Sequence, residues 1–244
     1  MFPKTPFPQR CLPIPDSNGH EHITSCLFYC FIYRDWWFLP DSNVEMENVK
    51  FYPWVGLNYK TGGIFDKKIM ALGASHYCED KIDANPCLTT RVVVRHLLRD
   101  VVEPWMNTYT NFERSLVNET TDAQMRCKIW NSLLFYNYVQ EPMDNRMAKP
   151  SRSQYIHSAS AFLEVLNKYN PDCCLVWGKT LWYNLPKENW EEAGVIVLDG
   201  KEHFRGTYIL NDGTKVPFLC IKHPAQGYAW DYMHRVINEF FYNI

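Results

Sequence analysis

The stretch Ile69-Met70-Ala71-Leu72-Gly73-Ala74-Ser75-His76-Tyr77 sets an apolar run directly before a turn of small and polar residues. A short apolar run closed by glycine predicts a buried strand over 67–72 that ends at Gly73. About 150 positions later the arrangement recurs, where the apolar run 218–221 is followed by Lys222 and His223-Pro224. Each stretch places polar groups at the end of a buried strand, so the two form a site if the fold brings them together.

Apolar runs alternate with amphipathic stretches along the rest of the chain. Strands are predicted at 131–139, 173–177 and 195–198, and a hairpin at 207–210 and 216–221 with Asp212-Gly213 at its turn. Helices are predicted at 22–33, 91–100, 122–130, 158–169 and 230–241, with Thr89-Thr90 as the N-cap of the second. Because strands alternate with helices, the sequence predicts an α/β fold with a mostly parallel sheet.

Four of the predicted strands end in residues that suit a binding site. These residues are Gly73, Asn137, Gly178 and His223. Ligands of open α/β sheets bind at the carboxyl ends of the strands. We therefore expect the four strand ends to share one rim of the sheet, and the candidate site to lie there.

Composition and charge narrow the class of protein. The chain has 244 residues, which predicts a single α/β domain over 51–244 preceded by an N-terminal arm and packing segment over 1–50. Its net charge of −2 leaves no global basic field, so a nucleic-acid surface has to be local. Aromatic residues make up 16%, which indicates either a thick core or a surface that stacks on bases.

Cysteine usage and hydropathy predict a cytoplasmic protein with neither metal nor cofactor. The nine cysteines are irregularly spaced and form no CxxC pair, which disfavours a zinc ribbon or an iron–sulfur site. Such usage fits a reducing compartment. The longest apolar stretch, 26–33, is too short to span a bilayer, so no membrane partner is expected.

In their order along the chain, the four strand-end motifs resemble the uracil-DNA glycosylase superfamily over roughly residues 65–230. Residues 73–77 correspond to the first turn of the family, and Asn137 corresponds to its pyrimidine-reading asparagine. Residues 175–178 correspond to the family's Leu-Leu-Trp-Gly strand. Residues 223–225 correspond to its His-Pro-Ser motif, with alanine in place of serine. The match is closest to a divergent branch with a Gly-x-Ser-His-Tyr turn. The resemblance implies three α/β/α layers around a central, mostly parallel four-stranded sheet.

The resemblance also implies a monomeric, monofunctional DNA glycosylase, which excises a flipped-out uracil-like or modified pyrimidine. His223 would donate a hydrogen bond to the departing base, and Ser75 would hold the attacking water. The base-binding residues implied are Gly73, Ala74, His76, Tyr77 and Asn137. A modified phage base, attacked in defence, is one substrate of this kind.

Ser75 departs from the family pattern, in which Asp or Asn is commonest at this position. A hydroxyl holds water but does not balance the positive charge that develops on the sugar. Three explanations stay open. Glu79 or Asp80 supplies the charge, the substrate has an unusually good leaving group, or the protein binds without cleaving.

DNA is the partner that the resemblance implies, held by loops on the same rim. The candidate contacts are Lys149, Arg152 and Ser153 in a basic loop over 141–153, Gly178 and Lys179 after the third strand, and Gly227 and Tyr228 after His223. Tyr228 is either a wedge that enters the duplex or a core residue.

Two other functions are compatible with the residues. The first is a non-catalytic nucleic-acid or nucleotide-binding protein on the same fold, because fold does not fix function. The second is a hydrolase that uses Ser75 and His223 as a nucleophile pair. This chain lacks the Gly-x-Ser-x-Gly elbow typical of such hydrolases, which disfavours the second function.

Overall fold

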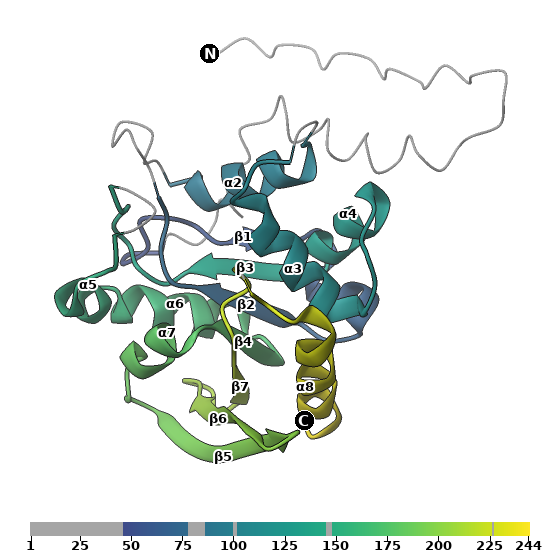
Figure 1. Cartoon of the computed structure of the whole chain (residues 1–244). Helices are drawn as coiled ribbons and strands as arrows, with labels where there is room; N and C mark the ends of the chain where they lie inside the picture. The colour runs from purple at the N-terminus through teal and green to yellow at the C-terminus, as the bar shows by residue number, and fades with distance from the viewer. Residues whose placement is uncertain (1–45, 78–85, 100–101, 145–147, 226) are drawn as a thin grey trace, which may run out of the picture. The chain divides into compact units, whose positions relative to one another are not determined.

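A mixed sheet forms the centre of the fold (Figure 1). The computed structural model describes residues 46–77, 86–99, 102–144, 148–225 and 227–244. Within them, seven strands lie in the order β1-β3-β2-β4-β7-β6-β5. Their bounds are Trp54–Val55 (β1), Ile69–Gly73 (β2), Leu133–Asn137 (β3), Cys173–Trp177 (β4), Trp190–Leu198 (β5), Lys201–Ile209 (β6) and Lys215–Ile221 (β7).

The four central strands, β3, β2, β4 and β7, run parallel to one another. Every residue of β2, β3 and β4 is buried, as expected for parallel strands covered on both faces. Gly73 pairs with Asn137 across β2 and β3, and Trp177 pairs with Ile221 across β4 and β7. The carboxyl ends of the four strands therefore meet at one rim, as the sequence predicted.

The central, mostly parallel four-stranded sheet that was expected is the middle of a larger sheet of seven described strands, which is only partly parallel. Beyond the parallel centre, β1 pairs antiparallel with β3, and the β5–β6 ribbon continues antiparallel from β7. The run 195–198 belongs to the edge strand β5, which is largely exposed. The hairpin of β6 and β7 is confirmed, and Gly213 at its turn has the positive φ of +86° that glycine tolerates.

The helices that the sequence predicted within the described residues are present. The structure adds three α-helices that were not predicted, α3, α5 and α7. The α-helical bounds are Leu88–Leu97 (α2), Met106–Val117 (α3), Ala123–Asn131 (α4), Arg152–His157 (α5), Ala159–Tyr169 (α6), Lys179–Asn184 (α7) and Trp230–Tyr242 (α8), with short 3₁₀ turns at Tyr59–Thr61 (η1) and Gly63–Phe65 (η2). The predicted helix at 22–33 lies outside the described residues.

The N-cap of α2 differs from the prediction. Cys87 occupies the cap position and makes no side-chain cap hydrogen bond. Thr89 is already inside the first turn of the helix, where it is fully buried. Its hydroxyl is therefore available to another partner, described below.

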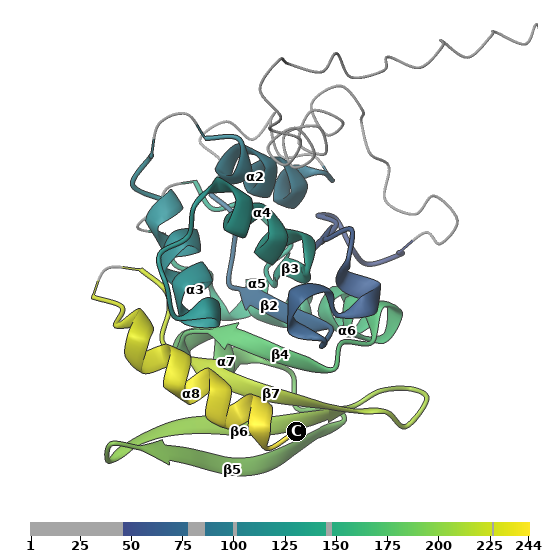
Figure 2. The same ribbon diagram turned by 90° about the vertical axis from the view of Figure 1, so that its right-hand side faces the viewer.

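Helices cover both faces of the sheet. On one face, Leu72, Tyr136 and Val176 pack in a core with side chains of α6 and α7. On the other face, the Phe135 ring lies 5.6 Å from those of both Tyr109 in α3 and Trp130 in α4. Helix α8 lies beside α3 and packs on β7 (Figure 2). The fold is thus a three-layer α/β/α arrangement around a seven-stranded sheet.

The described residues all belong to one compact unit, Phe38–Ile244. At its beginning, the backbone amides of Glu47 and Asn48 donate to the Glu164 carboxylate at 2.7 and 2.9 Å. The amides of Lys50 and Phe51 donate to the Gln140 side chain. In the part of the chain that the structure describes, no helix is long and apolar enough to cross a membrane.

Candidate functional site

The pairing of β2 with β3 continues past the strand ends and shapes the first half of the candidate site. The amides of Tyr138 and Val139 donate to the carbonyls of Gly73 and Ala74, both at 2.9 Å. The Met143 amide donates to the His76 carbonyl at 2.8 Å. These bonds hold the turn at 73–77 against the chain that follows β3.

Asn137 lies directly over Gly73. A Cβ atom placed on Gly73 would stand 2.2 Å from the Asn137 Oδ1 atom, far inside van der Waals contact. Gly73 has an ordinary φ, so glycine is needed here for space and not for backbone freedom. The missing side chain at position 73 lets the Asn137 amide lie against the end of β2.

His76 joins Asn137 to helix α2. Its Nδ1 atom lies 3.1 Å from Asn137 Nδ2, and its Nε2 atom lies 2.9 Å from Thr89 Oγ1. Burial lowers the pKa of His76 to about 3, so the imidazole is neutral. A neutral ring accepts at one nitrogen and donates at the other, which fits donation from Asn137 to Nδ1 and donation from Nε2 to Thr89.

This geometry changes the role expected of His76. The sequence placed it among the base-binding residues, yet it is only 3% exposed and the Phe51 ring meets it edge-on at 5.4 Å. Both ring nitrogens contact protein groups. His76 is therefore a positioning residue for Asn137 and not a surface open to a ligand.

The second half of the site is built from β4 and β7. The Gly178 amide donates to the Ile221 carbonyl at 2.9 Å, and Gly178 has a φ of +94°. A Cβ atom on Gly178 would stand 3.4 Å from the His223 Cβ atom. His223 is exposed, and its ring meets that of Trp177 nearly edge-on at 6.1 Å. Desolvation by nearby protein atoms lowers the pKa of His223, so its imidazole is neutral at pH 7.

An aromatic layer connects the two halves. The Phe135 and Trp177 rings lie 5.2 Å apart, and a Phe135 ring carbon comes within 3.5 Å of a Cβ placed on Gly73. Contacts therefore run from Asn137 and Gly73 through Phe135 and Trp177 to His223. The buried Trp177 Nε1 has no hydrogen-bond partner among the residues described.

The remaining residues of the first turn border this layer. Ala74 and Ser75 are half-buried, and Tyr77 is 49% exposed and bridges to Met143. Glu79 and Asp80, the two acids that might replace the missing aspartate, lie outside the described residues.

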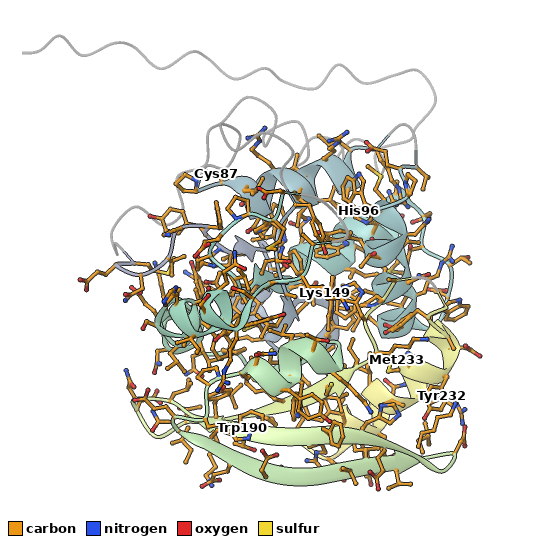
Figure 3. The ribbon with its side chains drawn as sticks, turned by 60° about the vertical axis from the view of Figure 1, so that its left-hand side comes forward. Cys87, His96, Lys149, Trp190, Tyr232 and Met233 are labelled. Carbon is orange, nitrogen blue, oxygen red and sulfur yellow. The ribbon has the colours of Figure 1, made fainter. Side chains whose placement is uncertain are left out.

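Three exposed lysines come after three of the parallel strands in the sequence. Lys149 lies in the connection after β3 (Figure 3), Lys179 begins α7 after β4, and Lys222 follows β7. All three are exposed. Lys179 also lies over the Phe204 ring at 5.0 Å. Lys222 donates to the carbonyl of Gly227, which is exposed, at 2.5 Å.

Two expectations about DNA contacts need correction. Arg152 and Ser153 are exposed, but they form the first turn of α5 and not a loop, because Ser151 and Gln154 make a capping box. Tyr228 is 7% exposed, and its hydroxyl donates to Ser115 Oγ at 3.0 Å. Tyr228 is a core residue, so it does not serve as a wedge.

Sequence reasoning missed the contribution of α3. Asn111 donates from Nδ2 to the Pro224 carbonyl at 3.0 Å, which anchors the turn that carries His223. Asn107 and Asn111 resemble an ordinary solvated helix face in the sequence, so no signal singles them out. A cavity of about 430 Å³ lies between this helix and Ala225.

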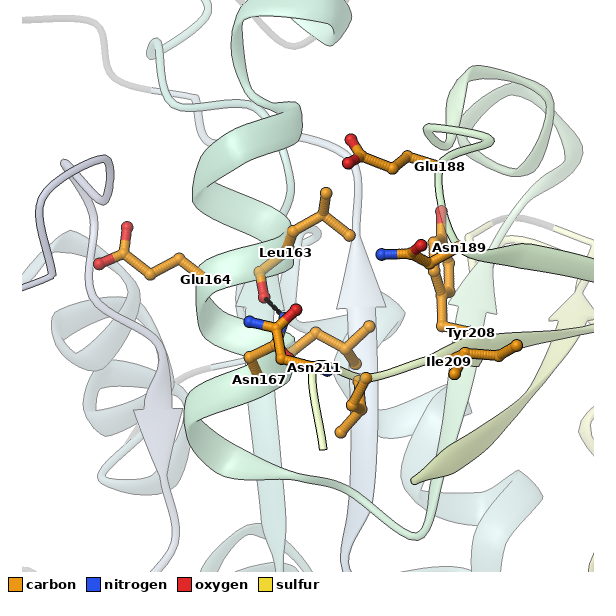
Figure 4. A pocket seen from close by; sticks show the side chains of 10 residues that line it. Leu163, Glu164, Asn167, Glu188, Asn189, Tyr208, Ile209 and Asn211 are labelled. Atoms are coloured by element: carbon orange, nitrogen blue, oxygen red, sulfur yellow. Dashed lines mark hydrogen bonds between the residues drawn. The ribbon is translucent and has the colours of Figure 1, made fainter. Parts of the chain in front are cut away.

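Another cavity, of about 310 Å³, is remote from the candidate residues (Figure 4). It lies between α6 and the end of β6, with Asn167, Tyr208 and Asn211 in its wall. Residues 209–211 precede β7, whereas His223 follows it, so this cavity belongs to the other end of that strand. Across the described ranges, no group of three or more His, Cys, Asp or Glu side chains is placed to hold a metal ion.

The full sequence was compared with family models and with curated proteins. No family model matches it, and no curated protein matches it.

Proposed function

We propose that the chain is a DNA glycosylase of the uracil-DNA glycosylase type, which hydrolyses the N-glycosidic bond of a flipped-out uracil-like or modified pyrimidine. One observation carries the proposal. Asn137 and His223 stand at the carboxyl ends of the parallel strands β3 and β7, within one continuous set of contacts. The four parallel central strands β3, β2, β4 and β7 support the resemblance, which implies such a sheet, with β1 and the β5–β6 ribbon as additions at its sides.

Asn137 is the base-reading residue in this proposal. Its amide carries an acceptor and a two-hydrogen donor, which together match the ring N–H and the adjacent carbonyl of a uracil-type edge. The contact with His76 uses one hydrogen of Nδ2 and leaves the other hydrogen and Oδ1. In the described chain, the hydrogen bonds given for Asn137 engage Nδ2 and the backbone carbonyl and leave Oδ1 without a donor. The side chain is 5% exposed, so the base has to reach it at the buried end of the strand.

His223 assists departure of the base. As the bond from the sugar to the base nitrogen breaks, its electron pair leaves with the base and negative charge grows on the base carbonyl. A neutral imidazole N–H donates to that oxygen and stabilises the charge, as an oxyanion hole does. Water adds to C1′ of the sugar and its proton ends on the released base, so the products are a free base and an abasic site.

Ser75 would position the attacking water. It is half-buried beside the first turn, and its hydroxyl can accept and donate to a water molecule. It supplies no negative charge to the oxocarbenium-like sugar. The proposal therefore favours a modified pyrimidine whose anion leaves more easily than that of plain uracil. A modified phage base fits where its substituent has this effect.

Lys149, Lys179 and Lys222 would hold the phosphates of the strand. Each adds an exposed positive charge to the chain after one of the parallel strands, within a protein of net charge −2. Phosphate contacts of this kind fix the register of a bound strand and make binding depend on salt.

A non-catalytic base-binding protein is the second candidate function. Serine at position 75 favours it, because the charge that assists cleavage in the family is missing at this position. It would use the same Asn137 and His223, and it predicts affinity without bond cleavage.

A panel of oligonucleotides distinguishes the two functions. Each carries uracil, hydroxymethyluracil, or plain or glucosylated hydroxymethylcytosine, and abasic sites are detected as alkali-labile breaks. We expect breaks with at least one modified base, slowed by Ser75→Ala and abolished by His223→Ala. The matched control is His157→Ala, at the exposed end of α5. Specific binding without breaks would establish the second function, and neither binding nor breaks would exclude both.

A further inference from the structure

The cavity beside α3 adjoins the turn that carries His223. It has a volume of about 430 Å³, is open to solvent, and is lined by Pro104, Asn107, Thr108, Asn111 and Ala225. The Ala225 amide donates to the His223 carbonyl at 2.8 Å, and Asn111 holds the Pro224 carbonyl between them. The cavity is therefore preformed and fixed to the same turn as the candidate catalytic histidine.

The wall that α3 contributes is polar and uncharged. One face of the helix is buried through Met106, Tyr109 and Phe112. The opposite face presents Asn107, Thr108 and Asn111 in its first two turns, with no charged side chain there. Solvated helix faces usually carry charges. Amide and hydroxyl groups contact both phosphates and base edges, but this wall lacks the Lys and Arg side chains that dominate phosphate binding.

The two sides of the turn that carries His223 lie close together. His223 contacts Gly178 and Trp177 on the side of the strand ends, and Ala225 faces α3 on the other side. Residues two apart in sequence have Cα atoms at most ~7.6 Å apart. Stacked nucleotides repeat every ~3.4 Å along one strand. The turn therefore spans no more than about two such steps, which places the cavity within range of a nucleotide that flanks one held at His223.

We propose that this cavity binds the base of the nucleotide adjacent to the excised one, with Asn107 and Thr108 contacting the edge of that base. This inference rests on the proposed function, because it needs a strand whose target base lies at Asn137 and His223. It assigns the protein a preference for the flanking base on one side of the target.

The test compares oligonucleotides with and without the flanking base. Each carries the cleaved base of the panel above, and a base-free tetrahydrofuran residue replaces the nucleotide on its 5′ or its 3′ side. Dissociation constants come from fluorescence anisotropy with the full chain, and cleavage rates from the same strands. We expect removal of the base on one side to weaken wild-type binding about tenfold, the scale of a good contact to a base edge.

The variant Asn107→Ala/Thr108→Val should bind the intact and base-free strands alike. Asn107→Ala alone changes only an exposed side chain, so it should not disturb the fold. It should reduce, without abolishing, the difference in affinity between the intact and the base-free strands. Gln124→Ala, an exposed residue of α4 outside the cavity wall, should keep the wild-type difference.

The two failures are separable. If wild type cleaves the target base but shows no preference on either side, or if the double variant keeps it, the cavity is not a nucleotide subsite and the glycosylase proposal stands. If wild type neither binds nor cleaves any strand, the proposed function fails and the inference fails with it.

Discussion

The Asn137 side-chain oxygen occupies the space that a Cβ atom on residue 73 would need, 2.2 Å from its position. Gly73 and Asn137 are also register partners in the parallel pair β2 and β3. The end of one strand is therefore shaped to receive the side chain at the end of the next. This relationship ties the first turn to the residue proposed to read the base.

Gly73→Ala should displace Asn137 and destabilise the fold. Inserting a methyl group into a packed site costs about 1–3 kcal/mol of unfolding free energy. The cost should shrink in an Asn137→Ala background, because that substitution removes the atom that the methyl group meets. Urea unfolding of the four chains of this cycle measures the coupling. An equal cost of Gly73→Ala in both backgrounds would contradict the contact.

His76 should make the stability of the protein depend on pH. Its pKa is about 3 in the folded chain, against 6.5 for an ordinary histidine. Between those values the unfolded chain binds a proton that the folded chain does not. The free energy of unfolding therefore falls as pH decreases from 6.5, by about 1.4 kcal/mol per pH unit.

His76→Gln should remove this slope. Between pH 7.5 and pH 5, the free energy of unfolding should fall in wild type by about 2 kcal/mol more than it falls in the variant. His157→Gln, which changes an exposed residue, should behave as wild type does. Parallel stability curves for wild type and His76→Gln would show that His76 titrates normally in the folded state.

Two buried tyrosines of one core should respond oppositely to loss of their hydroxyl groups. The Tyr136 hydroxyl has no hydrogen-bond partner among the described residues, whereas Tyr208 donates to the Pro186 carbonyl at 2.5 Å. Tyr136→Phe should leave stability unchanged or raise it, because it removes an unsatisfied polar group. Tyr208→Phe should lower it by about 1 kcal/mol. Thermal unfolding compares them, and an equal loss in both would contradict this assignment.

Glu113 should be the most sensitive carboxylate of the helical layer. It is fully buried and accepts hydrogen bonds from His96 at 2.5 Å, Thr121 at 2.6 Å and Trp130 at 2.8 Å. Burial by itself would raise the pKa of Glu113, but these hydrogen bonds outweigh it and hold the pKa below its usual value. The carboxylate is therefore ionised, with Arg126 at 3.8 Å.

Glu113→Gln should destabilise the protein by about 3–5 kcal/mol, because it leaves Arg126 uncompensated and turns an amide donor toward groups that already donate. Glu119→Gln, an exposed neighbour in sequence, should have no measurable effect. A shift in urea midpoint of similar size for both variants would show that the buried network contributes little.

The parallel centre of the sheet was predictable because its strands are uninterrupted apolar runs. Residues 69–73, 133–137 and 173–177 are buried on both faces, so their sequences carry a strong signal. The β5 strand carries a weak one, because most of its residues are exposed and its pairing depends on β6. Helix α3 was missed because its sequence mixes Asn, Thr and aromatic residues that favour no single element.

The candidate site was only partly predictable. The positions of Asn137 and His223 followed from the rule that parallel strands end at one rim. The role of His76 did not, because it depends on Thr89, thirteen residues away, and on the burial of both side chains. The burial of Tyr228 could not be predicted either, because its hydroxyl donates to Ser115, which lies in a helix that the sequence did not predict.

The most direct test of the central claim is mass spectrometry of the small molecules released from a modified-pyrimidine oligonucleotide by a stoichiometric amount of protein. We predict a free base and a strand whose mass has fallen by that of the base, less one water. His223→Ala should release neither product while retaining its fold by circular dichroism. Intact strands from every substrate of the panel, or undiminished release by His223→Ala, would contradict the account.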